Sequence, residues 1–271
     1  MTTFPTGKPH VSYSEIRAWK ECSWRHKLVY VDKIDMFKPS PNIDFGTHVH
    51  AECEDYLVKK TFDLERLERN IKTSWEQKSF GDPAPWVSEA KQIIEEIPDF
   101  LENQFPEWSC IASEHQLYEP IDGTDIKFKG FIDGMIRAKN GRGQEKLWII
   151  DWKTTSARGW SSDKRRDFLV QAQLALYKFY TSQKFEVDPK EIKCGFVLLK
   201  RGSKKGKSCE FIDVSLGPKA LENANKLVTS MIGSVSSGRF VKNRLSCTYC
   251  EFKGTDHCQG SQEYPAFTQA R

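Results

Sequence analysis

Residues 129–153 read KGFIDGMIRAKNGRGQEKLWIIDWK, and the rest of the chain is organised around this stretch. Two apolar-rich runs, Phe128–Ile136 and Leu147–Trp152, flank the turn sequence NGRG at 140–143. Asn and Gly accept the positive φ that tight hairpins need, so the pattern predicts an antiparallel β-hairpin. If the hairpin folds about the centre of that turn, Asp133 and Asp151 lie nearly opposite each other, within about 5–6 Å.

Two acids and a lysine then meet at one end of the hairpin. Side chains alternate along a strand, so Asp151 and Lys153 share a face and Trp152 takes the other. Carboxylates bind Mg²⁺ or Mn²⁺, and a lysine beside them can orient water or stabilise charge that develops on a phosphate. This set favours phosphodiester hydrolysis. The alternative is an exposed hairpin with solvated charges, since charged alternation is common on the wet face of a strand.

The composition is that of a soluble globular protein. The 271 residues are 29% charged and 38% hydrophobic, with a net charge of +4 and a mean hydropathy of −0.59. No apolar run approaches the roughly 18–20 residues of a membrane span, and the N-terminus lacks the apolar core of a signal peptide. We therefore expect a cytoplasmic protein with no membrane partner. Basic clusters at 164–166 and 200–207 either meet a phosphate backbone or are solvated surface.

The first part of the chain predicts mainly helices. Ser12 and Glu15 form a capping-box pattern that opens a helix to about Tyr30, with Cys22 inside it. Residues 45–52 read as the first turns of a second helix, in which a glycine allows a tight start and His50 and Glu54 fall one turn apart on one face. A structural histidine is the alternative for His50. Residues 59–104 read as helical, with an interruption at 81–85.

The second part predicts alternating strands and helices. Glu114–Pro120 is a predicted strand that pairs with the hairpin, and Glu114 is either an additional acid near the metal or a solvated strand end. A predicted helix from about Lys164 to Gln183 carries Gln173 and Tyr177, spaced i and i+4 on one face. Strands at 194–199 and 209–216 follow, the first after a crossover helix in a β-α-β step, and a helix spans 218–234.

The C-terminal region contains a third candidate group, Cys247, Cys250 and Cys258. Cys-x2-Cys followed by a third cysteine is ligand spacing, because a two-residue loop lets both thiolates face one metal centre. Three thiolates require a fourth ligand. His257 would complete a zinc site, and Cys22 is the other candidate if the N-terminal helix packs against this region.

Taken together, these features resemble the RecB-like branch of the PD-(D/E)XK nucleases, particularly its iron-sulfur members, the CRISPR-associated RecB-like exonucleases and the AddB nuclease domain. The resemblance covers nearly the whole chain and rests on six motifs in the family's order. They are Ser12-x-Ser14 through Cys22, Gly46-x-x-x-His50, Gly130-Phe131-Ile132-Asp133, Ile150-Asp151-Trp152-Lys153-Thr154, Gln173-x-x-x-Tyr177 and Cys247-x2-Cys250-x7-Cys258.

The resemblance also implies roles for these residues. It implies that His50, Asp133 and Asp151 bind a divalent Mg²⁺ or Mn²⁺ ion, that the carbonyl of Trp152 completes the metal shell, and that Lys153 is catalytic. Gln173 and Tyr177 would lie beside the active site. Cys22, Cys247, Cys250 and Cys258 would hold a 4Fe-4S cluster that ties the chain ends together. Zinc stays open as the alternative, because the spacing before Cys258 is longer than the family pattern.

We therefore predict one α/β domain over residues 1–271 with a restriction-endonuclease-like core. It consists of a mixed central sheet flanked by helices, a helical insertion at about 55–106, and a terminal cluster region formed jointly by 12–30 and 240–260.

The predicted function is a metal-dependent deoxyribonuclease, an exonuclease on single-stranded DNA ends in recombination, repair or CRISPR-related processing, in a bacterial cell or a phage-infected host. The alternatives are a catalytically silent DNA-end-binding or assembly subunit and a structure-specific endonuclease. No G-x-x-x-x-G-K-[ST] motif is present, so strand separation would need a partner such as a helicase, with a recombinase or a CRISPR integrase as other candidate partners.

Overall fold

The computed structural model describes residues 4–259, so Gly260 at the edge of the predicted cluster region lies outside the described residues. The chain divides into two compact units. Within the described residues, unit 1 comprises 4–38, 121–127 and 226–259, and unit 2 comprises 39–120 and 128–225. No helix in this described part is long and apolar enough to cross a membrane.

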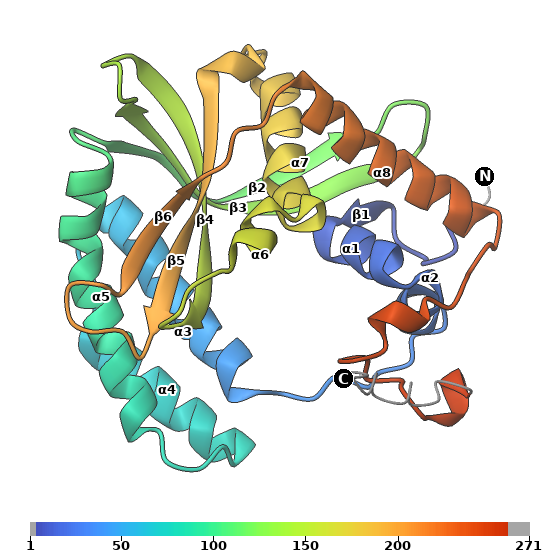
Figure 1. Ribbon diagram of the computed structural model, residues 1–271, viewed down its shortest axis with the longest axis horizontal. Helices are drawn as coiled ribbons and strands as arrows, with labels where there is room; N and C mark the ends of the chain where they lie inside the picture. Colours follow the sequence, from blue (N-terminus) through green and yellow to red (C-terminus); the bar gives the residue numbers. More distant parts are fainter. Residues whose placement is uncertain (1–3, 260–271) are drawn as a thin grey trace, which may run out of the picture. The chain divides into compact units, whose positions relative to one another are not determined.

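A mixed sheet forms the centre of unit 2 (Figure 1). The predicted hairpin is confirmed as β3 (Lys127–Lys139) and β4 (Glu145–Ser156), which pair antiparallel. β4 runs parallel to β5 (Ile192–Arg201), which pairs antiparallel with β6 (Cys209–Asp213). β2 (Ser109–Pro120) pairs with β3. The parallel β4–β5 step confirms the predicted β-α-β unit.

The hairpin turn fixes the register of β3 and β4. The side chain of Asn140 accepts hydrogen bonds from the N–H groups of Arg142 at 2.9 Å and Gln144 at 3.1 Å, and Gly143 takes a φ of +74°. The turn is therefore centred on Arg142, as predicted. Gly134 pairs with Ile150, and continuing this register by one residue brings Asp133 opposite Asp151.

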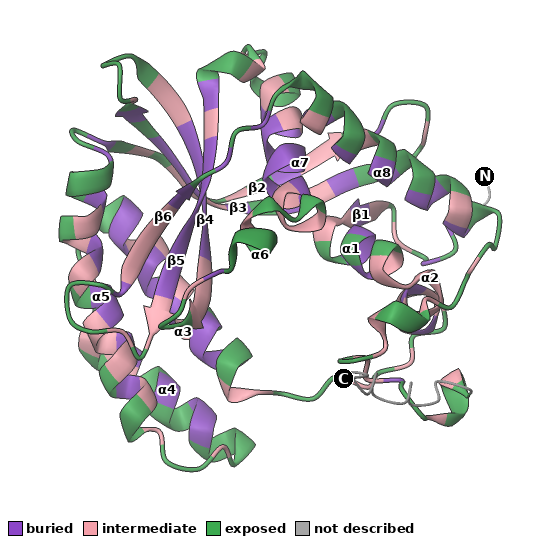
Figure 2. Cartoon of the chain, viewed as in Figure 1, coloured by how far each residue is buried: buried purple, intermediate pink, exposed green. Residues whose placement is uncertain are grey.

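Three helices cover one face of the sheet. α3 (Pro41–Lys59) and α5 (Ala84–Gln104) pack against the strands, and α4 (Leu64–Lys78) packs on both helices. The predicted helical region at 59–104 is thus present as α4 and α5, and it is interrupted where expected. Figure 2 shows the central strands β4 and β5 as largely buried. The core on this face includes Trp152, Val197 and Leu199 of these two strands. Phe45 of α3 and Ile94 of α5 belong to the same core.

The opposite face of the sheet is covered by α7 (Phe168–Phe185). Alternation along β5 supports this, since Val197 and Leu199 join the α3–α5 core while the Cys194 thiol lies 4.0 Å from the carbonyl oxygen of Leu174 on α7. The prediction of one continuous helix from 164 to 183 is wrong. Asp167 is extended and ends α6 (Ser162–Arg166), and its carboxylate caps α7 by accepting from the N–H of Leu169 at 2.7 Å.

Unit 1 contains β1 (His10–Ser12), α1 (Tyr13–Glu21), α2 (Ser23–His26), a π-helical turn over Lys27–Val31 and the second half of α8 (Pro218–Ser236). Short 3₁₀ turns follow at Arg244–Ser246 and Asp256–Cys258. Ser12 caps α1 as predicted, because its hydroxyl accepts from the N–H of Glu15 at 3.3 Å. The predicted continuous helix to Tyr30 is wrong, because Cys22 takes an extended conformation and separates α1 from α2.

Candidate active site and metal centre

Five predicted site residues come together in unit 2, at the end of the β3–β4 ladder. The N–H of Trp152 donates to Asp133 Oδ2 at 2.9 Å, and the same oxygen lies 3.9 Å from His50 Nδ1. Lys153 Nζ lies 2.5 Å from Asp151 Oδ2. The hairpin therefore supplies both aspartates and the lysine, and α3 supplies the histidine.

His50 reaches the hairpin because α3 packs closely on β4. The helix begins at Pro41 after the N-cap Ser40, so the prediction that Gly46 starts the helix is wrong. Gly46 lies inside the helix, where an added Cβ would be only 3.1 Å from the hydroxyl oxygen of Thr154. The missing side chain therefore allows the close helix–strand approach that brings His50, one turn later, beside Asp133.

Asp151 is the most unusual group of the site. Its side chain is 0% exposed, Lys153 Nζ is the partner of Oδ2, and Oδ1 has no hydrogen-bond partner within the described residues. Burial raises the pKa of Asp151, and the charge of Lys153 opposes this rise. A buried carboxylate oxygen without a hydrogen bond is costly unless a ligand supplies a partner for it. The side chain therefore fits a divalent metal.

His50 and Asp133 fit the same ion. Burial, followed by the charge of Lys153, lowers the pKa of His50 to about 3, so the imidazole is neutral at physiological pH and free to act as a ligand. Its Nε2 is buried and has no hydrogen-bond partner among the described residues. Burial and the neighbouring charge of Asp151 raise the pKa of Asp133. Two like charges share the site, which again favours a bound cation.

Two further acids border this site. Glu54 from α3 and Glu114 from β2 each place a carboxylate oxygen within 4.8 Å of one on Asp133, and the three together could hold a metal ion. Burial and the charge of Glu114 raise the pKa of Glu54 to about 7. The sequence predicted Glu114 as a possible additional acid but gave Glu54 no role. The i, i+4 spacing from His50 is the signal that could have identified Glu54.

Gln173 and Tyr177 lie beside the acids, on α7. Gln173 Nε2 donates to the Tyr177 hydroxyl at 3.2 Å. Burial, followed by the nearby charge of Asp151, raises the pKa of Tyr177, so the phenol stays protonated. An added Cβ at Gly130 would lie 2.7 Å from the Tyr177 ring, so only glycine at this position of β3 lets the ring pack here.

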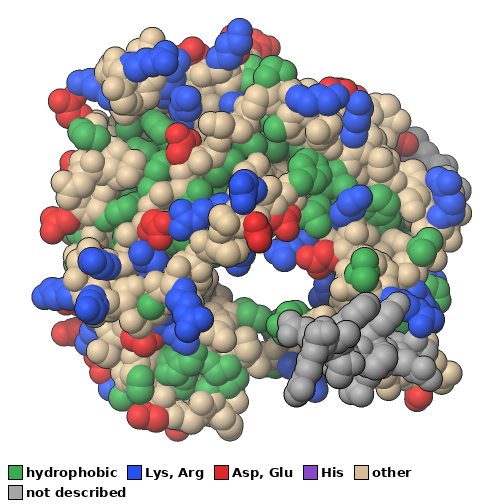
Figure 3. Space-filling view, viewed as in Figure 1, with side chains coloured by type: hydrophobic (Ala, Val, Ile, Leu, Met, Phe, Trp, Pro, Cys, Tyr) green, Lys and Arg blue, Asp and Glu red, His purple; other side chains and the backbone are tan. Residues whose placement is uncertain are grey.

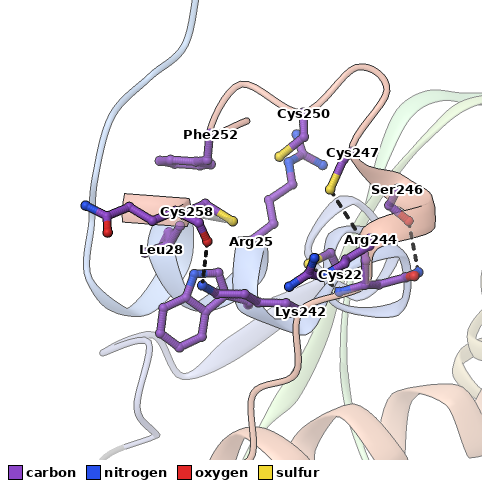
Figure 4. Close-up of a pocket in the computed structure, with 13 residues that line it drawn as sticks. Cys22, Arg25, Leu28, Lys242, Arg244, Ser246, Cys247, Cys250, Phe252 and Cys258 are labelled. Atoms are coloured by element: carbon purple, nitrogen blue, oxygen red, sulfur yellow. Dashed lines mark hydrogen bonds between the residues drawn. The ribbon is translucent and has the colours of Figure 1, made fainter. Parts of the chain in front are cut away.

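A second candidate site lies within unit 1. Cys22, Cys247, Cys250 and Cys258 line one pocket, and all four are free thiols (Figure 4). Cys22 comes from the break between α1 and α2, and the other three come from the C-terminal region. Of the two candidates for a fourth ligand, Cys22 lines this pocket and the His257 side chain does not.

The fold and the first site together define an α/β protein with carboxylates and a lysine at the end of a central hairpin. Residues 10–256 match the sequence model of the PD-(D/E)XK nuclease superfamily, and the chain belongs to this superfamily. Its members are generally nucleases that use divalent metals, so the family implies a DNA substrate.

One solved structure supports the fold. A "putative exonuclease" from Eubacterium rectale matches with a TM-score of 0.60 and 14% identity, over 88% of this chain and 85% of that chain. The structure of SSO0001 matches with a TM-score of 0.36 and 18% identity, over 88% of this chain and 93% of that chain. No curated protein matches the chain.

Proposed function

We propose that this protein is a divalent-metal-dependent deoxyribonuclease of the RecB-like type that works as an exonuclease on single-stranded DNA ends. The observation that carries the proposal is the Asp151–Lys153 pair, in which a fully buried carboxylate has the lysine beside Oδ2 and leaves Oδ1 without a hydrogen bond among the described residues. A purely structural ion pair does not explain why His50 Nε2 lacks a partner among the described residues. It also does not explain why three further acids, Glu54, Glu114 and Asp133, lie around the pair.

His50, Asp133, Asp151 and the carbonyl of Trp152 would hold a Mg²⁺ or Mn²⁺ ion. The ion supplies two things when bound, an activated water and polarisation of the phosphate. The hydrogen bond from the Trp152 N–H fixes the orientation of the Asp133 carboxylate. Lys153 keeps an ammonium beside the position where negative charge develops on the phosphate. Gln173 and Tyr177 hold each other in place at the edge of the site.

One exposed aromatic residue supports a single-stranded substrate. Phe131 lies two residues before Asp133 on β3, and its side chain is 41% exposed. The ammonium of Lys129 lies 5.5 Å from the centre of its ring. An exposed ring beside a cation can stack an unpaired base and contact its phosphate, which are the two contacts typical of single-strand binding. Such an activity would fit DNA recombination, repair or CRISPR-related processing alongside a helicase, recombinase or integrase.

For the cysteine pocket we propose a structural 4Fe-4S cluster rather than zinc. Thiolates around a tetrahedral zinc would lie about 3.8 Å apart, given a Zn–S distance of about 2.3 Å. Among the described residues, the Glu54, Glu114 and Asp133 set is the one group of three possible ligands within 4.8 Å of one another, so no three of the cysteine sulfurs form such a group. Arg25, Lys242 and Arg244 also line the pocket and would balance the charge of four thiolates.

The test is to incubate the purified protein with Mn²⁺ or Mg²⁺ and four DNA substrates, linear and circular, single- and double-stranded. The proposal predicts metal-dependent degradation of linear single strands and no cleavage of circles. Cleavage of circular DNA would indicate an endonuclease instead. DNA binding without any cleavage would indicate a silent end-binding subunit.

A further inference from the structure

The loop between β5 and β6, residues 202–208, carries three exposed lysines in a short space, Lys204, Lys205 and Lys207. Within the described residues their ammonium groups have no hydrogen bond and no ion pair. Other lysines of unit 2 are neutralised by acids, for example Lys59 by Asp55 at 2.7 Å and Lys146 by Glu191 at 2.6 Å. The loop therefore concentrates uncompensated positive charge.

This loop is held in one conformation by α5. The Glu96 carboxylate accepts from the N–H groups of Gly206 and Ser208, both at 2.7 Å, and from the Ser208 hydroxyl at 2.9 Å. Gln92 donates to the carbonyl oxygen of Ser203 at 3.0 Å and to the Ser208 hydroxyl at 2.8 Å. Ser208 is fully buried. Lysines that are merely solvated do not require a loop held by hydrogen bonds. A loop that is already fixed loses little conformational entropy when it binds a ligand, so these hydrogen bonds favour a binding role.

The start of the loop is anchored as well. The guanidinium of Arg201 stacks 3.6 Å from the centre of the Trp86 ring and pairs with Glu89 at 3.0 Å. Arg201 is thus neutralised and structural, while the three lysines beyond it are free. Figure 1 shows the loop beside α5, and Figure 3 shows basic side chains gathered on the surface in that place.

The sheet register relates the loop to the active site. Asp151 pairs with Phe196, and Ser156 pairs with Arg201, in the parallel β4–β5 ladder. The five steps from Phe196 to Arg201 span about 17 Å at about 3.3 Å per residue, so the loop begins about that far along the strand direction from the buried aspartate.

We propose that the β5–β6 loop is a second contact for the DNA backbone, which binds phosphates about 17 Å or more from the bond that is cut. This inference rests on the proposed nuclease function. It adds the path that the substrate strand takes beyond the active site. A polyanion is the partner that fits three fixed, unpaired ammonium groups. Each phosphate that a lysine neutralises releases a counterion, so the contact makes binding salt-dependent.

The test compares the triple variant Lys204→Gln, Lys205→Gln, Lys207→Gln with a control triple at the acid-paired, exposed lysines, Lys59→Gln, Lys72→Gln, Lys139→Gln. Binding of a 20-nucleotide single strand is measured in EDTA at several salt concentrations. The plot of log K against log salt has a negative slope, and we expect the magnitude of that slope to be smaller by about 2–3 for the loop triple than for the wild type. Cleavage of a dinucleotide with Mn²⁺ should stay at the wild-type rate, since its single phosphodiester occupies the active site and leaves no phosphate for the loop.

An unchanged slope in the loop triple, or an equal fall in the control triple, overturns the proposal. A loop triple that also loses cleavage of the short substrate overturns it too, because the loop would then act on the active site rather than on the distant strand. If the wild type binds DNA with the expected slope but cuts nothing, the nuclease function fails while the backbone contact stands. If the wild type does not bind DNA, both fail.

Discussion

The two candidate metal sites of this chain differ in how the polypeptide holds their ligands. The carboxylate site is built on two paired strands and a long helix, and the Trp152 N–H already orients Asp133. The cysteine pocket is built from a helix break and a region of short turns. Within residues 241–259, all of them described, Phe252 is the one buried residue.

Because of this difference, we expect the two sites to contribute differently to the stability of the protein. The carboxylate site is formed by the fold, and the fold bears the cost of burying the Asp151 carboxylate. The cysteine region has little apolar burial of its own, so a bound centre would contribute much of its stability. Removing a ligand from the first site should therefore impair chemistry, and removing one from the second should impair folding.

The largest expected effect is on catalysis. Lys153→Ala should lower the rate of DNA cleavage by about 10²–10³-fold or more, because the ammonium no longer stabilises charge on the phosphate. Single-turnover cleavage at saturating Mn²⁺ measures this. Lys146→Ala on the same strand, where the lysine pairs with Glu191, is the matched control and should keep wild-type activity. Equal rates for Lys153→Ala and the wild type would remove the lysine from the mechanism.

The next effect is on the cysteine region. Anaerobically purified protein should be brown and contain about four irons per chain, and Cys22→Ser should lose both colour and iron. A centre that links Cys22 to Cys247 closes a long loop, which the cross-link estimate values at about 5 kcal/mol. Cys22→Ser should therefore also expose both chain ends to limited proteolysis.

Cys194→Ser is the control for that experiment, because this thiol is buried between β5 and α7 and away from the pocket. Cys53, Cys110 and Cys209 are expected to be bystanders in the same way. A colourless wild-type protein with one zinc would refute the cluster and leave a four-ligand zinc site. Loss of iron in Cys194→Ser as well would refute the assignment of the ligands.

A smaller effect is expected at His50. His50→Ala should raise the Mn²⁺ concentration for half-maximal cleavage by about 10-fold, in the range seen when groups that support a metal are removed. The stability of the metal-free protein should change little. His48→Ala, on the same helix and 3.6 Å from Asp44, is the control and should leave the titration unchanged. Identical metal titrations for His50→Ala and the wild type would make His50 a structural histidine.

The smallest effect concerns pH. The pKa of Glu54 is raised from its ordinary value of 4.5 to about 7 by burial and by the charge of Glu114. Between these values the folded state binds more protons than the unfolded state, so the free energy of unfolding falls as pH rises from about 4.5 to about 7. Glu54→Gln removes this contribution and should become progressively more stable than the wild type over that window.

Urea unfolding of metal-free protein at several pH values measures the difference. Glu95→Gln, at an exposed position of α5, is the control and should show a constant difference from the wild type. Added Mn²⁺ should reverse the advantage of Glu54→Gln, because the metal binds the ionised carboxylate. A pH-independent difference for Glu54→Gln would contradict the coupling to Glu114.

The sequence predicted the parts of this structure that depend on local chemistry. The turn residues at 140–143 set the hairpin register, and alternation then placed Asp151 and Lys153 together. Errors arose where tertiary contacts decide the local structure. The Cys22 break is stabilised by distant groups, since the side-chain amide of Asn243 donates to the Glu21 carbonyl at 2.7 Å and the Trp24 N–H donates to the Val241 carbonyl at 3.1 Å.

The roles of two residues of the site depend on distant parts of the chain. The sequence suggested that Gly46 starts a helix. Its actual role is the close contact with Thr154, and that residue lies more than a hundred positions away in the chain. Glu54 looked like an ordinary helix-surface acid, and only the pairing of β2 with β3 brings Glu114 and Asp133 to it. Residues whose function depends on such long-range packing become visible once the fold is known.

The measurement that tests the central claim most directly compares wild-type protein with Asp151→Asn on end-labelled linear single-stranded DNA across a Mn²⁺ titration. Asn keeps the shape of the buried side chain and removes its charge. We predict that the wild type degrades the strand only when Mn²⁺ is present and that Asp151→Asn stays folded but cuts at least about 10³-fold more slowly. A folded Asp151→Asn protein that cuts at the wild-type rate would contradict the assignment of this site.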